Sequence, residues 1–380
     1  MTMSEVKVQA SGTAGHSSDG GLSNKSRVKE TSEDVENIKI RRENEFLFTY
    51  QEEPHRSRRM EIIKAHPEVT KLVGHEPLTK WIVVGVVALQ FSTAWFMRGA
   101  SFSSWYFWAA AYFIGATCNS NIFLAIHELS HNLAFKKPLH NKLFAIFANI
   151  PIGIPYSAGF GPYHQLHHKH MGEPDYDTDL PTSLEAMFLS SVAGKAFFAT
   201  FQLLFYAIRP MCVIKVNMTW VHYLNIAVQL AVDALFIKLV CHDSSGSLDL
   251  MPFYYLLLSA FLAGSLHPIA GHFIAEHYVL DAPKEYDLKK TALPETYSYY
   301  GWLNVFVYNA GYHNEHHDFP YIPWSRIKTL HTIASEFYDP LPSYTSWIYV
   351  IYRFVFDENV SLWCRVKRSN IKANKGDDQP

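Results

Sequence analysis

Residues 120–131 read Ser-Asn-Ile-Phe-Leu-Ala-Ile-His-Glu-Leu-Ser-His, so an apolar run ends on two histidines four residues apart. The run begins at Gly99 and has no charged residue before His127. It is longer than the roughly 20 residues that a helix needs to cross a bilayer. Because positions i and i+4 share a helix face, His127 and His131 point the same way at the end of a predicted span. We therefore expect a helical membrane protein with a histidine site at the end of its spans.

Two further stretches repeat this histidine pattern. Residues 164–168 read His-Gln-Leu-His-His, and residues 313–317 read His-Asn-Glu-His-His. With residues 127–131 as box one, these boxes two and three bring the imidazoles to eight: His127, His131, His164, His167, His168, His313, His316 and His317. Zinc usually takes four ligands, whereas eight imidazoles are enough for two metal ions with positions open for oxygen. The number of histidines favours a dinuclear iron oxidase over a zinc hydrolase.

Apolar runs suggest the membrane topology. Five are long enough to consider: residues 81–97, 99–126, 186–208, 216–238 and 250–275. Three of them follow box two, and three crossings would place box three across the membrane from boxes one and two. One run must therefore not cross. Lys195 lies inside run 186–208, and basic residues flank both of its ends, so we expect an interfacial or re-entrant element there.

The predicted fold is all-α, with four transmembrane helices, interfacial helices and a cytosolic helical cap that carries a histidine-rich di-iron site. The broken apolar segment 146–160 is expected to be interfacial because Pro and Gly interrupt it. Residues 242–249 contain no Lys or Arg, as expected of a lumenal loop, which places both termini and all three boxes on the cytosolic side. The sequons at Asn24, Asn217 and Asn359 should then stay unglycosylated.

Composition and short motifs exclude several other classes of protein. The 33 basic and 35 acidic residues form no basic stripe, which argues against nucleic acid as a partner. The four cysteines form no CxxC pair, so neither a disulfide framework nor a zinc knuckle is expected. The sequence has no GxGxxG loop and no His-Pro-Gly-Gly haem segment, so any electrons must come from another protein.

The spacings HxxxH, HxxHH and HxxHH among membrane segments resemble the membrane-bound fatty acid desaturases. Residues 46–59, Phe-Leu-Phe-Thr-Tyr-Gln-Glu-Glu-Pro-His-Arg-Ser-Arg-Arg, with residues 66–68 and 311–320, narrow this resemblance to the sphingolipid Δ4-desaturases. The resemblance divides the chain into a disordered tail, a sphingolipid-desaturase segment, a desaturase domain and a flexible tail, at residues 1–44, 45–77, 78–366 and 367–380.

The resemblance implies an endoplasmic-reticulum enzyme that acts on dihydroceramide, with two iron ions and O2. Its product would carry a trans double bond between carbons 4 and 5 of the sphingoid base. Electrons would come from cytochrome b5 and its NADH-dependent reductase. The basic residues Lys136, Lys137, Lys169 and the cluster 56–59 are candidates to pair with the acidic surface of cytochrome b5.

Relatives of this kind need a further metal ligand between boxes two and three. Residues 271–278 offer His277 as the first candidate and His272 as the next, although one or both of them can instead form hydrogen bonds with box residues. Glu128 and Glu315 lie inside boxes and are expected beside the ligands, accepting ring N–H bonds or steering the metal geometry. Asn309, four residues before His313, is a candidate to share its helix face and hold a water on one iron.

Asp175, Asp177 and Asp179 form an acidic patch after box two. A solvated loop is the simplest interpretation, and the alternative is that their carboxylates accept protons from ligand histidines.

Three other functions compete with the desaturase. A C4-hydroxylase would use the same boxes, and some relatives catalyse both reactions. A metal transporter would place ionisable residues inside the crossings along the ion path, whereas these histidines cluster at the cytosolic ends. A non-catalytic lipid-binding protein would leave the three box spacings without a reason.

Overall fold

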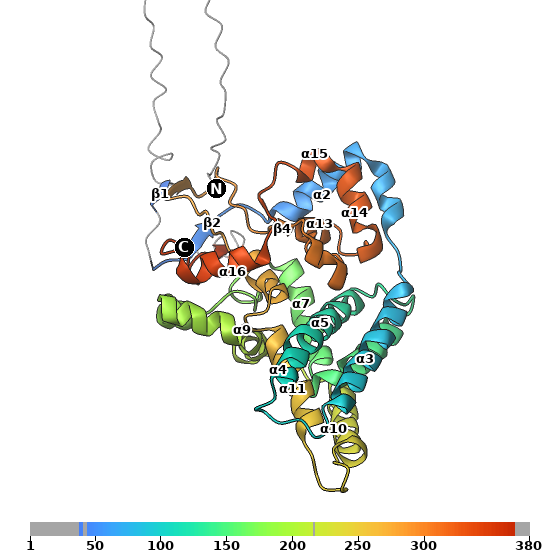
Figure 1. Cartoon of the computed structure of the whole chain (residues 1–380). Helices are drawn as coiled ribbons and strands as arrows, with labels where there is room; N and C mark the ends of the chain where they lie inside the picture. The colour runs from blue at the N-terminus through green and yellow to red at the C-terminus, as the bar shows by residue number, and fades with distance from the viewer. Residues whose placement is uncertain (1–37, 41–43, 216, 369–380) are drawn as a thin grey trace, which may run out of the picture. The chain divides into compact units, whose positions relative to one another are not determined.

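The computed structural model describes residues 38–40, 44–215 and 217–368, and the described residues from Lys39 onward form one compact unit. These residues are mainly helical (Figure 1). The predicted tails, residues 1–44 and 367–380, lie almost wholly outside the described residues.

Within the described ranges, four helices are long and apolar enough to cross a membrane. They are α3 (Leu78–Phe96), the continuous helix Trp105–Ser130, α9 (Val192–Val213) and α10 (Trp220–Val240). The second is assembled from α4 (Trp105–Ala109), the π-helical segment η2 (Ala110–Ala116) and α5 (Thr117–Ser130). By length and composition, the number of candidate membrane helices agrees with the four that were predicted.

The members of this set differ from the prediction. By length and composition α9 qualifies, although it covers the run expected not to cross, and α11 (Met251–Ala263) is shorter, at 13 residues. In Figure 1, α9 runs across the view and is not parallel to α3 or α5. Lys195 of α9 is buried, and its Nζ donates to the carbonyl oxygens of Asp357 and Val360, both at 2.7 Å. That α9 lies along the interface stays a prediction.

A sharp bend follows box one. Helix α6 (Pro138–Asn149) runs into the 3-10 turn η3 (Ile150–Ile152), and α7 (Ser157–Lys169) leaves at 117° to this pair. Gly153 ends η3 with a φ of 78°, and a Cβ on it would lie 2.7 Å from Leu257. The predicted break within residues 146–160 is therefore present, and it turns α7, which carries box two.

Polar contacts hold α10 to the bent pair. Asn149 Nδ2 donates to Gln229 Oε1 at 2.7 Å, and Ser157 Oγ donates to Asn225 Oδ1 at 3.2 Å. All four residues are buried. In a membrane, hydrogen bonds of this kind join helices where the hydrophobic effect does not. The contacts therefore fix the helix of box two against a predicted span.

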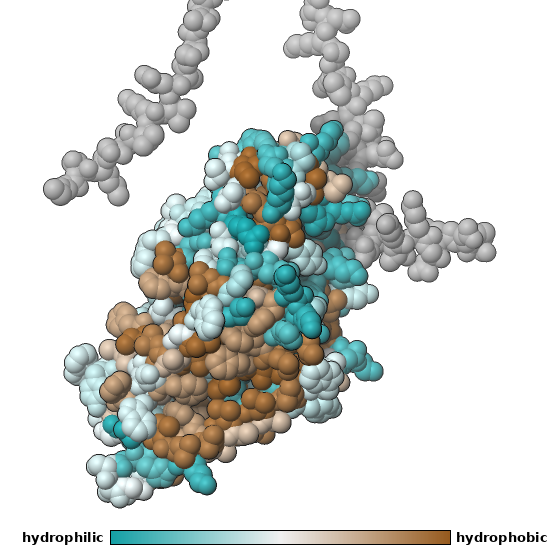
Figure 2. Space-filling model, turned by 90° about the vertical axis from the view of Figure 1, so that its right-hand side faces the viewer, coloured by the Kyte–Doolittle hydropathy of each residue, from teal (hydrophilic) through white to brown (hydrophobic). Residues whose placement is uncertain are grey.

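A mostly polar cap covers one end of the apolar part. Its helices are α2 (Pro54–Ala65), the 3-10 helix η1 (Pro67–Leu72), α14 (Trp324–Ile333) and α15 (Ser335–Tyr338). Ile62, Leu330 and Tyr338 are fully buried together inside it. Figure 2 shows polar residues over much of this end and apolar residues over most of the other part. Box three, on α13 (His313–Asp318), packs against α2 and α14.

Short elements complete the described chain. The helical ones are α8 (Ser183–Leu189), η4 (Ile269–Gly271), α12 (His272–Ala275), η5 (Trp302–Phe306) and α16 (Trp347–Phe356). The strands are β1 (Ile38–Ile40), β2 (Leu47–Thr49), β3 (Glu285–Asp287), β4 (Ser298–Tyr299), β5 (Ser343–Tyr344) and β6 (Val366–Arg368). Strand β2 pairs in parallel with β6, with Leu47 opposite Val366, and β4 pairs with β5. The predicted segment 45–77 thus packs on both the end of the desaturase domain and box three.

Candidate metal centre

The three boxes meet in one place. Box one ends α5, box two ends α7, and box three forms most of α13. Five of their imidazoles form a first group in which all potential ligand nitrogens lie within 4.8 Å of one another: His127, His131, His164, His168 and His316. We call this set the five-histidine group.

A second group lies beside the first. His167, His277 and His317 have ligand nitrogens within 4.8 Å of one another, and we call them the three-histidine group. His313 adjoins it, with its Nε2 3.0 Å from His277 Nε2. The rings of His168 and His317 stack at 4.1 Å between centroids, so the two groups touch. The structure thus brings together all eight box histidines and His277, which the sequence had placed first among the extra candidates.

The ring nitrogens fit metal ions by distance. When two nitrogens bind the same first-row metal ion at about 2.1 Å each, with an N–metal–N angle near a right angle, they lie about 3.0 Å apart. The observed Nε2 to Nε2 distances are 3.1 Å for His131–His164, 3.1 Å for His164–His168 and 3.2 Å for His168–His316. In the second group, His167 Nε2 lies 3.1 Å from His277 Nε2. His317 Nε2 is buried and has no hydrogen-bond partner among the described residues, as a metal-binding nitrogen would be.

Burial keeps the box three imidazoles neutral. The pKa values of His313, His316 and His317 are held well below the ordinary value of 6.5, first by burial and then by neighbouring imidazoles. The same causes, with Arg365, lower the pKa of His277. A neutral imidazole has the free lone pair that a metal ion needs.

Carboxylate and carbonyl groups orient two rings of the three-histidine group. His167 Nδ1 donates to Asp177 Oδ1 at 2.8 Å, and His277 Nδ1 donates to the carbonyl oxygen of Glu295 at 3.1 Å. Each contact places the ring proton on Nδ1 and leaves Nε2 for a metal. Asp177 is buried and also accepts from the backbone N–H of Gly172 and Asp179. For Asp177 the solvated-loop interpretation is wrong, whereas Asp175 is exposed.

The two box glutamates form other contacts. Glu128 Oε2 accepts from the backbone N–H of Trp324 at 3.3 Å. Glu315 is fully buried and accepts from Ser298 Oγ and Tyr300 Oη, while His331 Nδ1 lies 2.6 Å from its Oε1. These contacts link the two carboxylates to the surrounding elements. Among the described residues, they do not join either carboxylate to a ring of the histidine boxes. A role beside the ligands stays a prediction.

Asn309 and His272 lie outside both groups. Asn309 precedes α13 in a left-handed conformation (φ 53°), so the helix face assumed for it is wrong, and its Nδ2 donates to the carbonyl oxygen of Trp324 at 2.9 Å. His272 Nδ1 lies 3.1 Å from Glu276 Oε1, and its ring stacks on Phe273.

A contact network that sequence reasoning missed joins α2 to box three. His55 Nδ1 lies 2.7 Å from Asp318 Oδ1, and the rings of His55 and His317 lie 4.8 Å apart. Arg58 pairs with the same carboxylate through Nε at 2.7 Å. The signal in the sequence that could have indicated this network was the stretch 52–59, which supported the family resemblance but predicted no contact. Since Arg58 is held here, the expectation that it is free for cytochrome b5 is wrong.

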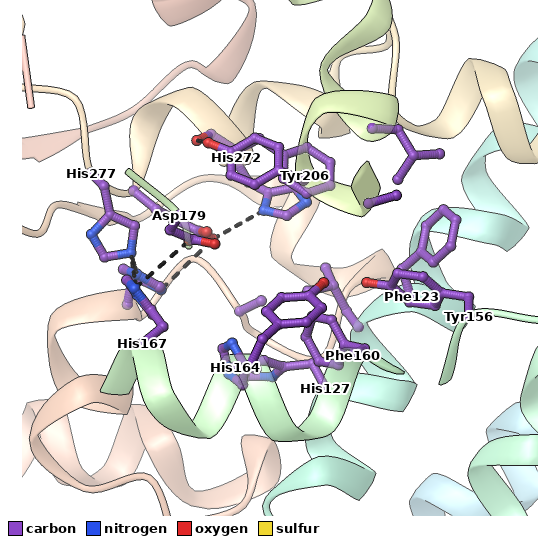
Figure 3. Close-up of a pocket in the computed structure, with 18 residues that line it drawn as sticks. Phe123, His127, Tyr156, Phe160, His164, His167, Asp179, Tyr206, His272 and His277 are labelled. Atoms are coloured by element: carbon purple, nitrogen blue, oxygen red, sulfur yellow. Dashed lines mark hydrogen bonds and ion pairs between the residues drawn. The ribbon is translucent and has the colours of Figure 1, made fainter. Parts of the chain in front are cut away.

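One cavity borders both histidine groups (Figure 3). It encloses about 790 Å³ of space between protein atoms, its open mouth included. His127 and His164 of the first group line it, as do His167 and His277 of the second. A substrate in this cavity would therefore lie against both groups.

Comparisons with known proteins agree with this geometry. Residues 103–348 match the family described as fatty acid desaturase, and residues 42–78 match the one described as sphingolipid Delta4-desaturase. A sphingolipid delta(4)-desaturase of Komagataella phaffii is 57% identical, and the match covers 88% of this chain and 91% of that protein. One of Schizosaccharomyces pombe is 53% identical, covering 87% and 90%.

A third relative has a broader name. The sphingolipid delta(4)-desaturase/C4-monooxygenase of Homo sapiens is 41% identical, and the match covers 87% of this chain and 97% of that protein. The matches therefore include nearly the whole of each relative and all three histidine boxes. This chain belongs to the fatty acid desaturase family, within its sphingolipid delta(4)-desaturase branch.

Proposed function

We propose that the chain is a membrane oxidoreductase that introduces a trans double bond between carbons 4 and 5 of the sphingoid base of dihydroceramide, giving ceramide. The observation that carries this proposal is the meeting of nine histidines beside one cavity, in a chain that is 53–57% identical to sphingolipid delta(4)-desaturases. Acid and base side chains alone do not remove hydrogen from an unactivated alkyl chain, whereas a metal centre that reacts with O2 does.

The reaction balances with one O2, two electrons and two protons. One hydrogen leaves each of the two carbons, and all four hydrogens end in two waters. A pair of iron ions, when bound by these imidazoles, supplies the oxidant, since imidazole suits iron. We assign His127, His131, His164, His168 and His316 to one ion. We assign His167, His277, His313 and His317 to the other.

The protein contributes orientation and water exclusion. Asp177 and the Glu295 carbonyl hold the Nδ1 protons of His167 and His277, so both rings keep Nε2 toward the centre. Phe160 stacks on His164 at 4.9 Å between centroids and lines the cavity. An aromatic wall of this kind keeps water from the oxidant and packs against a hydrocarbon chain.

Electrons would come from cytochrome b5, itself reduced by its NADH-dependent reductase, at the endoplasmic-reticulum membrane. This assignment is supported by the absence of a flavin or haem motif in the sequence and by exposed Lys136, Lys137 and Lys169 near the boxes. A cytosolic position of boxes and termini is required for such a donor to reach the site.

A sphingolipid C4-hydroxylase is the second candidate. The name of the Homo sapiens relative includes C4-monooxygenase, and both reactions would begin with hydrogen removal at the same end of the chain. Their products differ, because desaturation removes two hydrogens and hydroxylation adds one oxygen.

Lipid mass spectrometry tests the proposed function. The chain is expressed in a host that lacks the activity and is fed dihydroceramide, beside a His167→Ala variant and an exposed-histidine control, His140→Ala. We expect ceramide with the wild type and His140→Ala and none with His167→Ala. An exclusively hydroxylated product would favour the second candidate, and conversion by His167→Ala would contradict the assigned centre.

A further inference from the structure

We propose that Asp179 and Glu276 bind the hydroxyl and amide groups of the sphingolipid, and that they thereby determine which carbons meet the metal centre. This inference rests on the proposed function and assigns the substrate-binding end of the same cavity. Both carboxylates line the cavity, together with His167 and His277.

Asp179 is held by its backbone, not by its side chain. Its N–H donates to Asp177 Oδ1 at 3.0 Å, and its carbonyl oxygen accepts from Arg365 Nη1 at 2.9 Å and from Arg209 Nη1 at 3.2 Å. Among the described residues, the ion-pair partner of its carboxylate is His167 Nδ1, 3.9 Å from Oδ2, which is beyond hydrogen-bond distance. The backbone of the loop is therefore held at Asp179, and the acceptor positions of its carboxylate are left for a ligand.

Glu276 also lines the cavity. Its Oε1 lies 3.1 Å from His272 Nδ1 and 3.7 Å from His313 Nδ1. Its side-chain contacts within the described part of the chain are made by Oε1, so Oε2 has room to accept from a donor. Its side chain is 15% exposed and lines the cavity.

The cavity changes character along its length. Figure 3 shows Asp179 near His167 and His277, with Phe123 and Tyr156 on the other side of the pocket. Leu203 and Phe160 add to the apolar lining. A site with carboxylates at one end and aromatic and aliphatic groups at the other suits a molecule with hydroxyl groups on one end of a hydrocarbon chain.

The spacing accounts for the position of the double bond. In dihydroceramide the 3-hydroxyl is on the carbon bonded directly to C4, and the amide is one carbon further away. A group that binds these donors must therefore lie next to the oxidant if C4 and C5 are to react. Asp179 meets this requirement, since its carboxylate is 3.9 Å from a proposed metal ligand. A distant headgroup site would place a mid-chain carbon at the centre instead.

Carboxylates are suited to these donors. Hydroxyl and amide N–H groups donate to an ionised carboxylate in charge-assisted hydrogen bonds, which are about twice as strong as neutral ones. Loss of one such bond in an enclosed site lowers kcat/KM by roughly tenfold to a hundredfold.

The test compares two substrates and several variants of the iron-loaded, purified enzyme, with reduced cytochrome b5 as donor. The substrates are dihydroceramide and its analogue without the 3-hydroxyl group. The variants are Asp179→Ala, Asp179→Asn and Glu276→Gln, with Asp175→Asn as the control, because Asp175 is exposed in the same loop. Kinetic constants and bound iron are measured for each.

We expect the wild type and Asp175→Asn to prefer dihydroceramide by at least about tenfold in kcat/KM. In Asp179→Ala, the ratio of kcat/KM for dihydroceramide to kcat/KM for the analogue should fall close to one, while bound iron stays at the wild-type level. If Asp179→Ala does not accumulate, Asp179→Asn, which keeps the side-chain shape, takes its place. Its preference for dihydroceramide over the analogue should then be lower than that of the wild type.

Two results would overturn the inference. One is a wild-type preference retained in both the Asp179 variants and Glu276→Gln. The other is loss of iron in the Asp179 variants, which would mean that Asp179 acts through His167 and not on the substrate. Wild-type protein that turns over neither substrate would contradict the proposed function itself.

Discussion

Arg58 of the cap holds Asp318, the residue that follows box three, through two hydrogen bonds. Its Nε lies 2.7 Å from Oδ2, and its Nη2 lies 2.9 Å from Oδ1. Arg58 Nη2 also donates to Asn314 Oδ1 at 3.2 Å, inside the box. Because Asp318 is fully buried, this pairing ties the position of α13 to that of α2. The amino-terminal segment is thus part of the support of the proposed metal centre.

Removing this arginine should loosen box three. Breaking a buried ion pair by deleting one partner costs about 3–5 kcal/mol, because the remaining charge is left uncompensated. We expect Arg58→Ala to lose most bound iron and to unfold at lower temperature, whereas Arg56→Ala, at an exposed position on the same helix, should do neither. Iron analysis and thermal unfolding in detergent are the measurements. Wild-type iron content in Arg58→Ala would show that α13 does not need this contact.

Asp177→Asn should weaken the three-histidine group. The carboxylate accepts the Nδ1 proton of His167 and raises the pKa of that ring although burial opposes it. An amide in its place orients the ring less firmly, and changes of this kind typically cost about 10–100-fold in metal affinity or activity. Titration of the iron-free protein with Fe(II) measures the effect.

The exposed neighbour Asp175→Asn is the matched control for this measurement and should bind iron as the wild type does. Equal iron affinity in the two variants would contradict the orienting role of Asp177.

Cysteine labelling can test the orientation in the membrane. Cys212 is exposed, so it is first replaced by serine, and single cysteines are placed at Ser244 and Lys137, both exposed. In sealed microsomes with the cytosolic face outward, a membrane-impermeant maleimide should label Lys137→Cys at once and Ser244→Cys only after detergent is added. Immediate labelling of Ser244→Cys would exclude a lumenal loop at residues 242–249.

Charge reversal at Lys136 and Lys137 should slow turnover with cytochrome b5. Both side chains are exposed, and charges at the edge of an interface act mainly on the association rate, in a salt-dependent way. The double variant to glutamate should therefore show a higher KM for cytochrome b5 at low ionic strength, with little change at high salt. Lys71→Glu, an exposed cap position outside the proposed surface, serves as control. Unchanged KM at low salt would remove these lysines from the docking surface.

The grouping of the box histidines could be predicted from the sequence because helical spacing is local. HxxxH and HxxHH bring their rings to one face of each helix, and the structure joins the three boxes as expected. His277 could be ranked above His272 by resemblance alone, and the structure places only His277 in a group. The split between groups was not predictable, since His167 and His168 are adjacent in sequence but enter different groups. Which ring enters which group depends on how α7 and α13 pack against each other.

Contacts between residues far apart in the chain could not be predicted from the sequence either. Asp177 was one of three acidic residues in a loop, and nothing in the sequence separates the buried carboxylate from the exposed Asp175. The pairing of Arg58 with Asp318 spans 260 residues and leaves no local pattern. Among the candidate membrane helices, α9 meets the length and hydropathy of a span and α11 is shorter, but neither quantity encodes the direction in which a helix packs.

The turn before box three requires a glycine at position 311, because a side chain there has no room. A Cβ at this position would lie 2.6 Å from Asn304 Oδ1 and 2.6 Å from the carbonyl oxygen of Tyr299, closer than real contacts allow. Both neighbours are fixed, since Asn304 Oδ1 accepts from the Gly311 N–H at 2.9 Å and Asn304 Nδ2 donates to the Tyr299 carbonyl at 2.8 Å. Gly311→Ala must therefore displace the backbone two residues before His313.

We expect this variant to lose about 1–3 kcal/mol of stability, the usual cost of overpacking, and to bind less iron. Gly159→Ala is the matched control, because it lies on the helix of box two and a Cβ there meets nothing within 4 Å. Thermal unfolding and iron content are measured for both. A destabilised Gly311→Ala protein with full iron would mean that the turn supports the fold alone, whereas loss of both would tie the turn to the position of box three.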